Sequence, residues 1–394
     1  MMIIGLVGKP SSGKSTFFKA ATLAEVAIAP YPFTTLEKNE GVGYVKTECV
    51  EKEFKVKCQP RFGYCINGIR FIPIKLIDVA GLVPEAHKGK GRGNAFLDDL
   101  SEADVLIHVL DASGKTDAEG NPTENYNVIE EVKFLQDEID LWMHAILGKN
   151  WQKFARKVQG TGEKLSTALA NQLSGLKISE EAVIKVMKKL NLNEKPMFWE
   201  EKDLMAFTRQ LRKEAKPIII AANKMDVPSA QENLKKLKTE FPELVIIPCS
   251  SEIELSLREA AKRELVSYIP GESKFEIKKE LSKQQKKALE FVRGYLEKNG
   301  NTGVQQCLNH AVFNTLKMVV AYPVENENKF TDKDGNVLPD AYLLPRGSSA
   351  FNLAEKVHSD VAKNFVAAID VRSKRRLPKD YALKDKDVIK IMTH

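Results

Sequence analysis

Histidine and cysteine are scarce in this sequence, which has six histidines and five cysteines among its 394 residues. The cysteines are Cys49, Cys58, Cys65, Cys249 and Cys307. An odd number of well-separated cysteines argues against a disulfide framework. The first three lie close together, but no CxxC pair exists and the nearest histidine, His87, lies well downstream. We therefore favour buried or half-buried thiols there over metal binding, and the sequence leaves the role of Cys49, Cys58 and Cys65 open.

Long apolar runs are also missing. No segment approaches the roughly 20 apolar residues of a membrane span, and the opening MMIIGLVGKP is too short and uncharged for a secretory signal. We therefore expect a cytoplasmic protein without a membrane partner. Internal repeats and low-complexity tracts are absent too, and a composition of 43% hydrophobic and 29% charged residues is typical of folded domains. A net charge of +7 weakly favours an anionic partner.

Short apolar segments rich in β-branched residues predict the strands of a central sheet. They span 3–8, 68–78, 103–111, 216–223 and 244–250. Helical patterns separate several of them, which predicts an α/β fold with a mostly parallel sheet and helices on both faces. The stretch FKVKCQPRFGYCINGIRF adds a candidate hairpin before Asp78.

The chain between the third and fourth of these strands is longer than one crossover needs, and it is mostly helical by pattern. Apolar residues at heptad spacing form a seam from Val128 to Ile146, and Gly148 follows as a candidate C-cap. Segments 162–190 and 200–214 are also compatible with helices. We expect a helical insertion at about 114–214, built as an antiparallel hairpin packed on itself. A partner-binding arm would use the same residues.

The C-terminal third changes in character. Two helical patterns, 278–300 and 302–317, precede a succession of strand, hairpin, helix and strand that predicts a small α+β domain. The expected division is therefore a first domain at 1–274, a helical connector at 275–317 and a final domain at 318–394.

The segment GKPSSGKS at 8–15 fits the P-loop pattern GxxxxGK[ST], and it lies between a strand and a helix as that motif requires. Its backbone N–H groups and the helix N-terminus predict a phosphate site. Lys14 is expected to reach the β- and γ-phosphates, and the Ser15 hydroxyl to bind Mg²⁺. The nucleotide-binding candidates from this loop are Gly8, Ser11, Ser12, Gly13, Lys14, Ser15 and Thr16.

The segment NKMD at 223–226 follows a strand and predicts the base preference. The Asp226 carboxylate can accept two hydrogen bonds from guanine that adenine does not offer, which would give discrimination against ATP. Asn223 and Lys224 belong to the same motif. Ser250 and Ser251, after the last core strand, are candidates to approach guanine through their backbone amides.

The segment DVAG at 78–81 supplies the remaining part of the site. Asp78 is expected to hold Mg²⁺ through water, and the Gly81 amide to contact the γ-phosphate. Upstream, PFTT offers Thr34 and Thr35, and we favour Thr35 for the last metal position. The catalytic candidates are thus Lys14, Thr35 and Gly81, and the metal candidates are Ser15, Thr35 and Asp78.

These motifs, in this order, resemble those of the Obg-like P-loop GTPases, with the closest similarity to the YchF subfamily. The residues that carry the resemblance are PYPFTTLEKNEGVG (30–43), DVAGLVPEAHKGKGRGNAFLDDL (78–100) and ADVLIHVLD (103–111). The stretch from about 319 is similar to a TGS domain, a β-grasp module. The resemblance implies a Ras-like G domain with GTP or GDP and Mg²⁺ as ligands.

Three positions depart from that family. YchF proteins typically have a changed guanine motif and can use ATP, whereas this chain keeps Asp226, so we expect GTP to be preferred. Related GTPases that need potassium have Asn where this chain has Ser11, which argues against a potassium requirement. Segment 91–94 is GRGN where GLGN is common.

Leu82 follows the DVAG glycine, at the position of the water-orienting glutamine of Ras-type GTPases. The Obg-like group has an apolar residue there, which implies slow hydrolysis by the isolated protein and stimulation by a partner. His87 offers an acid–base group nearby, but a solvent-facing loop histidine is the simpler interpretation.

The leading hypothesis is a regulatory GTPase with switch loops at 30–41 and 79–94 that acts in translation at the ribosome. The TGS-like domain and the helical insertion would bind the ribosome or RNA. One rival is an RNA- or ribosome-binding module that uses bound nucleotide as a sensing ligand with negligible turnover, and a more distant one is a small-molecule kinase. The basic residues Arg372, Lys374, Arg375, Arg376 and Lys379 fit RNA contact and a solvated loop equally well. The sequence leaves the oligomeric state open.

Overall fold

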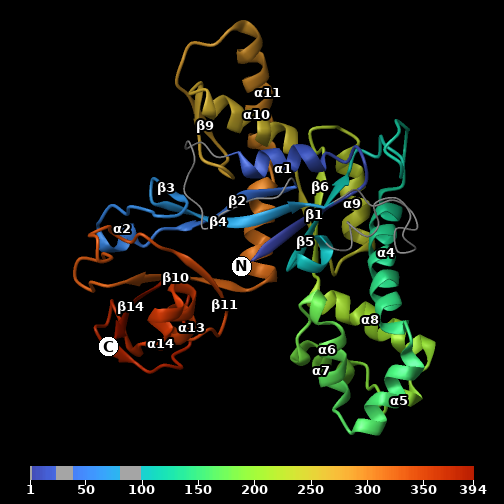
Figure 1. Ribbon diagram of the computed structural model, residues 1–394. Helices are drawn as coiled ribbons and strands as arrows, with labels where there is room; N and C mark the ends of the chain where they lie inside the picture. The colour runs from blue at the N-terminus through green and yellow to red at the C-terminus, as the bar shows by residue number, and fades with distance from the viewer. Residues whose placement is uncertain (1, 24–38, 80–98) are drawn as a thin grey trace. The chain divides into compact units, whose positions relative to one another are not determined.

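The structure is a computed structural model that describes residues 2–23, 39–79 and 99–394 (Figure 1). Its contacts form two compact units. The first comprises Met1–Lys19, Leu76–Ile253 and Thr302–Val304, and the second comprises Ala20–Lys75, Glu254–Asn301 and Gln305–His394. Because compactness and family resemblance divide a chain by different criteria, the predicted division at 274 and 317 stays a prediction.

A parallel sheet forms the centre of the first unit. Strand β5 (Val105–Asp111) lies between β1 (Ile3–Val7) and β6 (Ile218–Asn223), and β7 (Val245–Pro248) pairs with β6. All these pairs are parallel, and β1 and β5 are completely buried. The predicted mostly parallel α/β sheet is thus confirmed, and its strands end at a common edge.

The last residues of β4 (Ile69–Asp78) join that edge next to β1. The N–H of Val79 donates to the carbonyl of Leu6 at 3.1 Å, which holds Asp78 beside the end of β1. Asp78, Asp111 and Asn223 are the last residues of three strands of one sheet, β4, β5 and β6. This edge is where parallel sheets place ligands.

Helix α4 (Val128–Gly148) contains the predicted heptad seam. Its side chains Val128, Val132, Leu135, Ile139 and Trp142 are buried. The candidate cap at Gly148 is wrong, because Gly148 is the last residue of the helix and the following left-handed residue is Asn150, with φ 63°. An asparagine tolerates that conformation without glycine.

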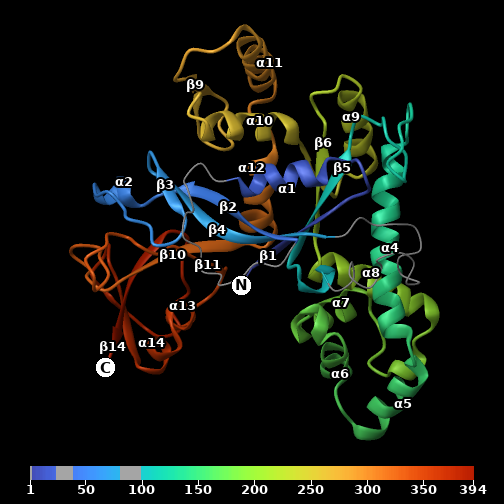
Figure 2. The same ribbon diagram turned by 45° about the horizontal axis from the view of Figure 1, so that its top comes forward.

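Four further helices gather along α4 and at one of its ends (Figures 1 and 2). They are α5 (Trp151–Thr161), α6 (Leu165–Gln172), α7 (Glu180–Lys189) and α8 (Glu201–Ala215). Trp151 stacks on Trp199 at 5.4 Å between ring centroids, and Trp199 contacts Phe207 at 5.2 Å. These helices share one core with the seam of α4, so they form a small bundle rather than a single hairpin.

Further helices and 3-10 segments of the first unit connect these elements. They are α1 (Lys14–Thr22, which runs on into the second unit), η2 (Ser174–Leu176), η3 (Pro196–Phe198) and α9 (Ala230–Glu240). None of the helices in the described part of the chain is long and apolar enough to cross a membrane.

The second unit begins with the predicted hairpin. Strand β3 (Tyr64–Ile66) pairs antiparallel with the start of β4, and the turn between them is Asn67-Gly68, with φ values of 51° and 75°. This is the turn chemistry that two-residue hairpins favour. Strand β2 (Glu40–Glu48) and the short helix α2 (Glu51–Phe54) precede it.

The C-terminal part of the second unit has a five-stranded sheet in the order β11-β10-β14-β12-β13. Its strands are β10 (Met318–Val324), β11 (Tyr342–Pro345), β12 (Phe365–Asp370), β13 (Arg376–Leu377) and β14 (Asp387–Thr393). Helices α13 (Ala350–Val357) and α14 (Ser359–Lys363) lie between β11 and β12 in the chain. The single helix predicted in this part of the chain is therefore divided into two, because His358 is extended and its side chain caps α14.

Six further elements precede the C-terminal sheet in the chain. They are α10 (Ser251–Lys262), β8 (Val266–Tyr268), β9 (Phe275–Ile277), α11 (Lys283–Asn299), α12 (Val304–Asn309) and the π-helix His310–Thr315. A buried charged group stabilises this region. Arg258 Nε donates to Glu254 Oε1 at 2.6 Å, and the Tyr268 hydroxyl donates to Glu254 Oε2 at 2.7 Å. Removing one charge of a buried pair leaves the other without compensation.

We expect Arg258→Met to lower the free energy of unfolding by about 3–5 kcal/mol, because Glu254 would then be a buried charge without its cation. Urea unfolding followed by circular dichroism measures the change. The matched control is Arg263→Met, at an exposed position close to the end of α10, which should change stability by no more than about 0.5 kcal/mol. Equal effects of the two variants would contradict a stabilising role for the buried Arg258–Glu254 pair.

Candidate functional site

Two glycines of the P-loop are required by their surroundings. Gly13 has φ 91°, and a Cβ there would lie 2.3 Å from the Asn223 side-chain nitrogen. A Cβ on Gly8 would lie 2.5 Å from the carbonyl oxygen of Val109. Both contacts are far too short for any side chain, so the loop passes close to β5 and β6 only because these positions are glycine.

The remaining P-loop candidates lie around the start of α1. Ser11 is exposed with φ 61°, Ser12 is completely buried, and Ser15 is exposed in the first turn. The Ser12 hydroxyl has no hydrogen-bond partner among the described residues. Thr16 follows on the helix and is half-buried.

Lys14 and Asp78, which come from two separate predicted motifs, lie in contact. The Lys14 ammonium contacts Asp78 Oδ1 and donates to the carbonyl of Val79 at 2.7 Å. Both side chains remain partly exposed, at 13% and 22%. A cation and a carboxylate from two separate motifs thus meet at the edge of the sheet.

Asn223 joins three motifs. Its side-chain NH₂ donates to the carbonyl of Ser12 at 2.9 Å, and its Oδ1 accepts from the backbone N–H of Ser251 at 3.0 Å and from the Ser251 hydroxyl at 2.9 Å. All of these groups are buried. The asparagine therefore fixes the P-loop relative to the segment after β7.

Asp226 lies close to the segment that follows β7. Its Oδ1 accepts a hydrogen bond from the Ser250 hydroxyl at 2.6 Å, and the N–H of Met225 donates to Cys249 O at 3.0 Å. The N–H of Ser250 itself donates to Thr302 O at 2.8 Å. The structure thus brings Asp226 and Ser250 together, but the backbone amides of Ser250 and Ser251, predicted to approach guanine, donate instead to Thr302 O and Asn223 Oδ1.

Asp111, which the sequence analysis did not single out, contacts Lys224 of the NKMD segment. Its Oδ2 accepts from Lys224 Nζ at 2.9 Å and from the Thr116 hydroxyl at 2.6 Å, and its Oδ1 accepts from the Ser113 hydroxyl at 2.5 Å. Burial alone would raise the pKa of Asp111, but the hydrogen bonds from Ser113, Thr116 and Lys224 outweigh it and lower that pKa. The sequence does place Asp111 at the end of an apolar strand, and this position could have marked it as a candidate for the site.

Lys9 is a second missed residue, and it anchors the P-loop. The Lys9 side chain is only 5% exposed, and a lysine is rarely buried unless its charge has a partner. Its Nζ lies 3.1 Å from Glu131 Oε2 on α4, donates to the carbonyl of Thr116 at 2.6 Å, and lies 4.0 Å from the centroid of the Tyr126 ring. The residue between Gly8 and Pro10 is thus tied to the first turn of α4.

Several predicted features lie outside the described residues. They are Thr35, Gly81, Leu82, His87, the GRGN segment at 91–94 and most of the two switch loops. Their roles stay predictions.

The basic C-terminal residues are largely engaged within the fold. Arg372 donates to both carboxylate oxygens of Glu53, at 2.6 and 2.7 Å. Lys374 donates to Asn328 at 3.1 Å, and Lys379 lies 3.8 Å from the centroid of the Phe351 ring. Within the described residues, the exposed side chains of Arg375 and Arg376 make no such contact.

We expect Asp111→Asn to lower the free energy of unfolding at neutral pH by about 1–3 kcal/mol, because several buried donors lose an ionised acceptor. A carboxyl with a lowered pKa stabilises the fold above its ordinary value of 3.8 and loses that contribution as the pH falls through its folded-state pKa. The deficit of the variant should therefore shrink in acid.

Urea unfolding of both proteins, from neutral pH down to about pH 3, tests this. The control is Asp137→Asn on α4, whose carboxylate is 63% exposed. A deficit that stays constant with pH would show that the ionised state of Asp111 does not contribute.

Three family models match the chain. Residues 3–146 match the model described as 50S ribosome-binding GTPase, residues 221–326 match Obg-like GTPase YGR210-like, G4 motif-containing domain, and residues 328–393 match the TGS domain. The first two cover the P-loop and the NKMD motif, and the third covers the sheet of β11, β14, β12 and β13.

Known proteins match along almost the entire chain. A GTP-binding protein of Methanocaldococcus jannaschii is 51% identical, over 100% of this chain and 99% of its own length. The ribosome-binding ATPase YchF of Buchnera aphidicola is 26% identical, over 92% of this chain and 86% of its own. The crystal structure of a GTP-binding protein from Pyrococcus horikoshii is 40% identical, covers 100% of both chains and superposes with a TM-score of 0.81. The chain belongs to the Obg-like, YchF-type family of P-loop GTPases that carry a C-terminal TGS domain.

Proposed function

We propose that this protein is a regulatory GTPase that binds GTP with Mg²⁺, hydrolyses it slowly to GDP and phosphate, and acts on the ribosome. The observation that carries the proposal is the Asn223 side chain, which binds Ser12 of the P-loop and Ser251 together and so joins the phosphate motif to the base motif. This arrangement suits one ligand with a phosphate end and a purine end.

The phosphate end rests on the P-loop. Gly8 and Gly13 allow the backbone to turn tightly around an anion, and the N-terminus of α1 contributes its positive end. Lys14 provides a cation at the edge of the sheet, and the buried Ser12 hydroxyl has hydrogen-bonding capacity that no described side chain uses. We assign phosphate binding to Gly8, Ser11, Ser12, Gly13 and Lys14, together with the helix residues Ser15 and Thr16.

The residues near Lys14 fit a magnesium site. The Asp78 carboxylate and the exposed Ser15 hydroxyl are oxygen donors of the kind Mg²⁺ prefers, and Thr35 is the third predicted donor. When bound, the ion neutralises charge on the β- and γ-phosphate oxygens. Lys14 is assigned to the β- and γ-phosphates, and the Gly81 amide is assigned to the γ-phosphate. Asp78 contacts Lys14, so the two groups can hold each other in place at the γ-phosphate end.

The base end rests on Asp226. A carboxylate accepts hydrogen bonds from guanine N1–H and the exocyclic amine, whereas adenine leaves it unpaired. The Ser250 hydroxyl at 2.6 Å orients this carboxylate, and Lys224, held by Asp111, continues the same loop. The relatives carry different names, GTP-binding protein in Methanocaldococcus jannaschii and ATPase in Buchnera aphidicola. Retention of NKMD supports guanine in this chain.

We expect Asp226→Ala to weaken GTP binding by about 10- to 150-fold, as the loss of hydrogen bonds to a charged acceptor predicts. The affinity for ATP should stay nearly unchanged. Titration with fluorescent GTP and ATP analogues measures both constants, and steady-state phosphate release measures turnover.

The matched control is Asp137→Ala, which removes an exposed aspartate on α4 and should leave both affinities unchanged. Lys14→Ala provides the baseline without phosphate recognition. Equal use of ATP and GTP by the unaltered protein, with no effect of Asp226→Ala, would refute the guanine preference.

Slow turnover follows from Leu82, an apolar residue at the position of a water-orienting glutamine. The alternative from another class, a ribosome- or RNA-binding module that uses nucleotide only as a sensing ligand, rests on the same residue. Multiple turnover of GTP distinguishes the two, because a sensing module releases no more than one phosphate per chain.

The ribosome is the partner that the family likeness favours. One matched family model is described as a 50S ribosome-binding GTPase, and the Buchnera aphidicola relative is named as ribosome-binding. Arg375 and Arg376 are exposed on the TGS domain and suit an RNA backbone.

We expect the protein to sediment with ribosomes more strongly when loaded with a non-hydrolysable GTP analogue than with GDP, because a regulatory GTPase presents its partner surface in one nucleotide state. Ultracentrifugation through a sucrose cushion, with the pellet quantified by immunoblot, measures this. The affinity should fall with added salt. Equal or absent pelleting in the two states would count against a ribosomal switch.

A further inference from the structure

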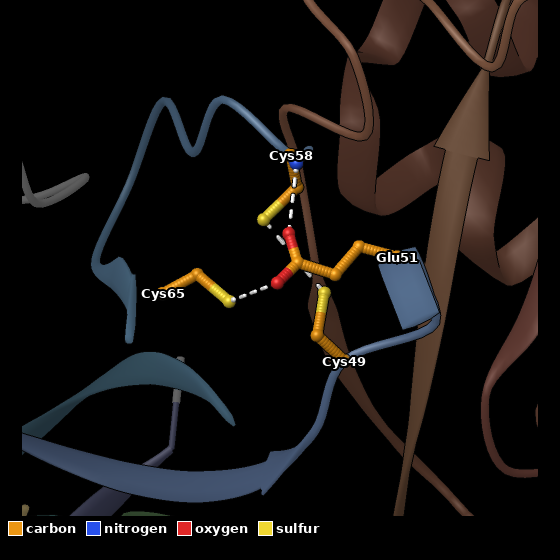
Figure 3. A group of neighbouring side chains, drawn as sticks. All are labelled: Cys49, Glu51, Cys58 and Cys65. Carbon is orange, nitrogen blue, oxygen red and sulfur yellow. Dashed lines mark hydrogen bonds between the residues drawn. The ribbon is translucent and has the colours of Figure 1, made fainter. Parts of the chain in front are cut away.

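Three of the cysteines and one glutamate form a cluster in the second unit. Figure 3 shows the side chains of Cys49, Glu51, Cys58 and Cys65 converging, with one ligand atom of each within 4.8 Å of all the others. Cys49 and Cys58 are buried, at 4% and 6% exposure, and Cys65 and Glu51 are half-buried. We call these four residues the cysteine–glutamate cluster. The sequence analysis expected buried thiols here but overlooked Glu51.

Local backbone turns bring the four residues together. Cys49 follows β2, Glu51 begins α2, and Cys65 lies on β3. The chain reverses after α2 at Lys55, with φ 55°, and turns again at Gly63, with φ 71°, where a Cβ would lie 2.0 Å from a backbone oxygen of β4. This geometry does not depend on the sequence spacing of a CxxC pair.

The distances match the edges of a tetrahedral metal site. Cys49 Sγ and Cys58 Sγ are 3.8 Å apart, and Cys65 Sγ lies 3.4 Å from Glu51 Oε1. Zinc–sulfur bonds of about 2.3 Å and zinc–oxygen bonds of about 2.1 Å, arranged tetrahedrally, give S···S edges of about 3.8 Å and S···O edges of about 3.6 Å. The ligand atoms therefore need to move very little to bind one ion.

A backbone hydrogen bond orients the Glu51 carboxylate. The N–H of Cys58 donates to Glu51 Oε2 at 2.8 Å, which leaves Oε1 directed at Cys65 Sγ. At Cys49 the backbone itself is held, because its N–H donates to the carbonyl of Gly68 at 2.9 Å. Hydrogen bonds that orient ligating groups in this way are typical of metal sites.

The surroundings also suit thiolate ligands. Three thiols and one carboxyl share a small volume in which two of the cysteines are buried. Each of these groups binds a metal in its deprotonated form, so a bound cation would neutralise the negative charges that ligation creates.

We propose that the cysteine–glutamate cluster binds one zinc-class divalent metal ion through Cys49, Glu51, Cys58 and Cys65, as a structural site. Soft thiolates select zinc over magnesium or calcium, and four protein ligands leave no open position, as in structural sites. A disulfide is the chemical rival. It would join two of the sulfurs at about 2.05 Å and would leave the third cysteine and Glu51 without a shared role.

The site would stabilise a loop that contacts the TGS domain. Between the last two ligands, the N–H groups of Gln59 and Arg61 donate to the carbonyls of Val337 and Pro339, both at 2.8 Å. Arg70, almost completely buried, donates to the carbonyls of residues 338 and 339 at 3.1 and 2.7 Å. An ion that fixes residues 49–65 therefore also fixes the partner loop of the C-terminal sheet.

The direct test is the metal content of the intact protein, purified under reducing conditions without a histidine tag. We expect about one zinc per chain by mass-spectrometric elemental analysis. Replacement with Co²⁺ should give the thiolate charge-transfer band and the visible bands of tetrahedral cobalt. A chelator should lower the melting temperature, and added Zn²⁺ should restore it.

Variants separate this site from general effects on folding. Cys58→Ala should abolish zinc binding, whereas Cys307→Ala, at a buried cysteine of α12 outside the cluster, should retain it. Glu51→Gln preserves size and should weaken Zn²⁺ binding at least about tenfold while the circular dichroism spectrum stays unchanged.

Two outcomes would overturn the proposal. One is reduced, folded protein that takes up no Zn²⁺ or Co²⁺. The other is a Cys49–Cys58 disulfide in the native protein, detected by intact mass under non-reducing conditions, with no metal regained after reduction. Because neither result involves nucleotide, the GTPase assignment is tested separately.

Discussion

The site at the edge of the parallel sheet depends on the buried side chain of Asn223. It binds the carbonyl of Ser12 on one side and the amide and hydroxyl of Ser251 on the other. Unpaired polar groups at these positions would be costly, because no water reaches them to replace a lost partner. The position of Asn223 also requires glycine at residue 13, because the Asn223 amide occupies the space that a Cβ would fill. One contact thus sets the spacing between two motifs that are more than 200 residues apart in the chain.

Local patterns predicted the parts of the fold that local energetics determine. Apolar strands, the heptad seam of α4 and the Asn67-Gly68 hairpin are all encoded within a few neighbouring residues. Strand β12 (Phe365–Asp370) was missed because it pairs with β14 over a long separation and reads as the continuation of a helix. Strand β2 (Glu40–Glu48) was missed because glycines interrupt its pattern.

The candidate site was predictable where a motif has a fixed order. Lys14, Asp78, Asn223 and Asp226 were all named from such motifs, and the structure brings Lys14 to Asp78 and Ser250 to Asp226. Lys9, Asp111 and Glu51 were not, because each is defined by partners from elsewhere in the chain. Buried charges and ligand clusters are tertiary properties, which neither composition nor spacing specifies.

The ion pair between Lys9 and Glu131 connects the P-loop to a second element, helix α4. Lys9 follows Gly8 directly, and Glu131 lies in the first turn of α4, the helix on which the bundle of α5 to α8 is built. Any nucleotide that shifts the backbone at Lys9 also changes the energy of this buried ion pair. Because this pair is buried, a movement of α4 away from the P-loop would leave a charge without its partner, at a cost of about 3–5 kcal/mol. The position of the P-loop backbone at Lys9 therefore depends on the position of the first turn of α4.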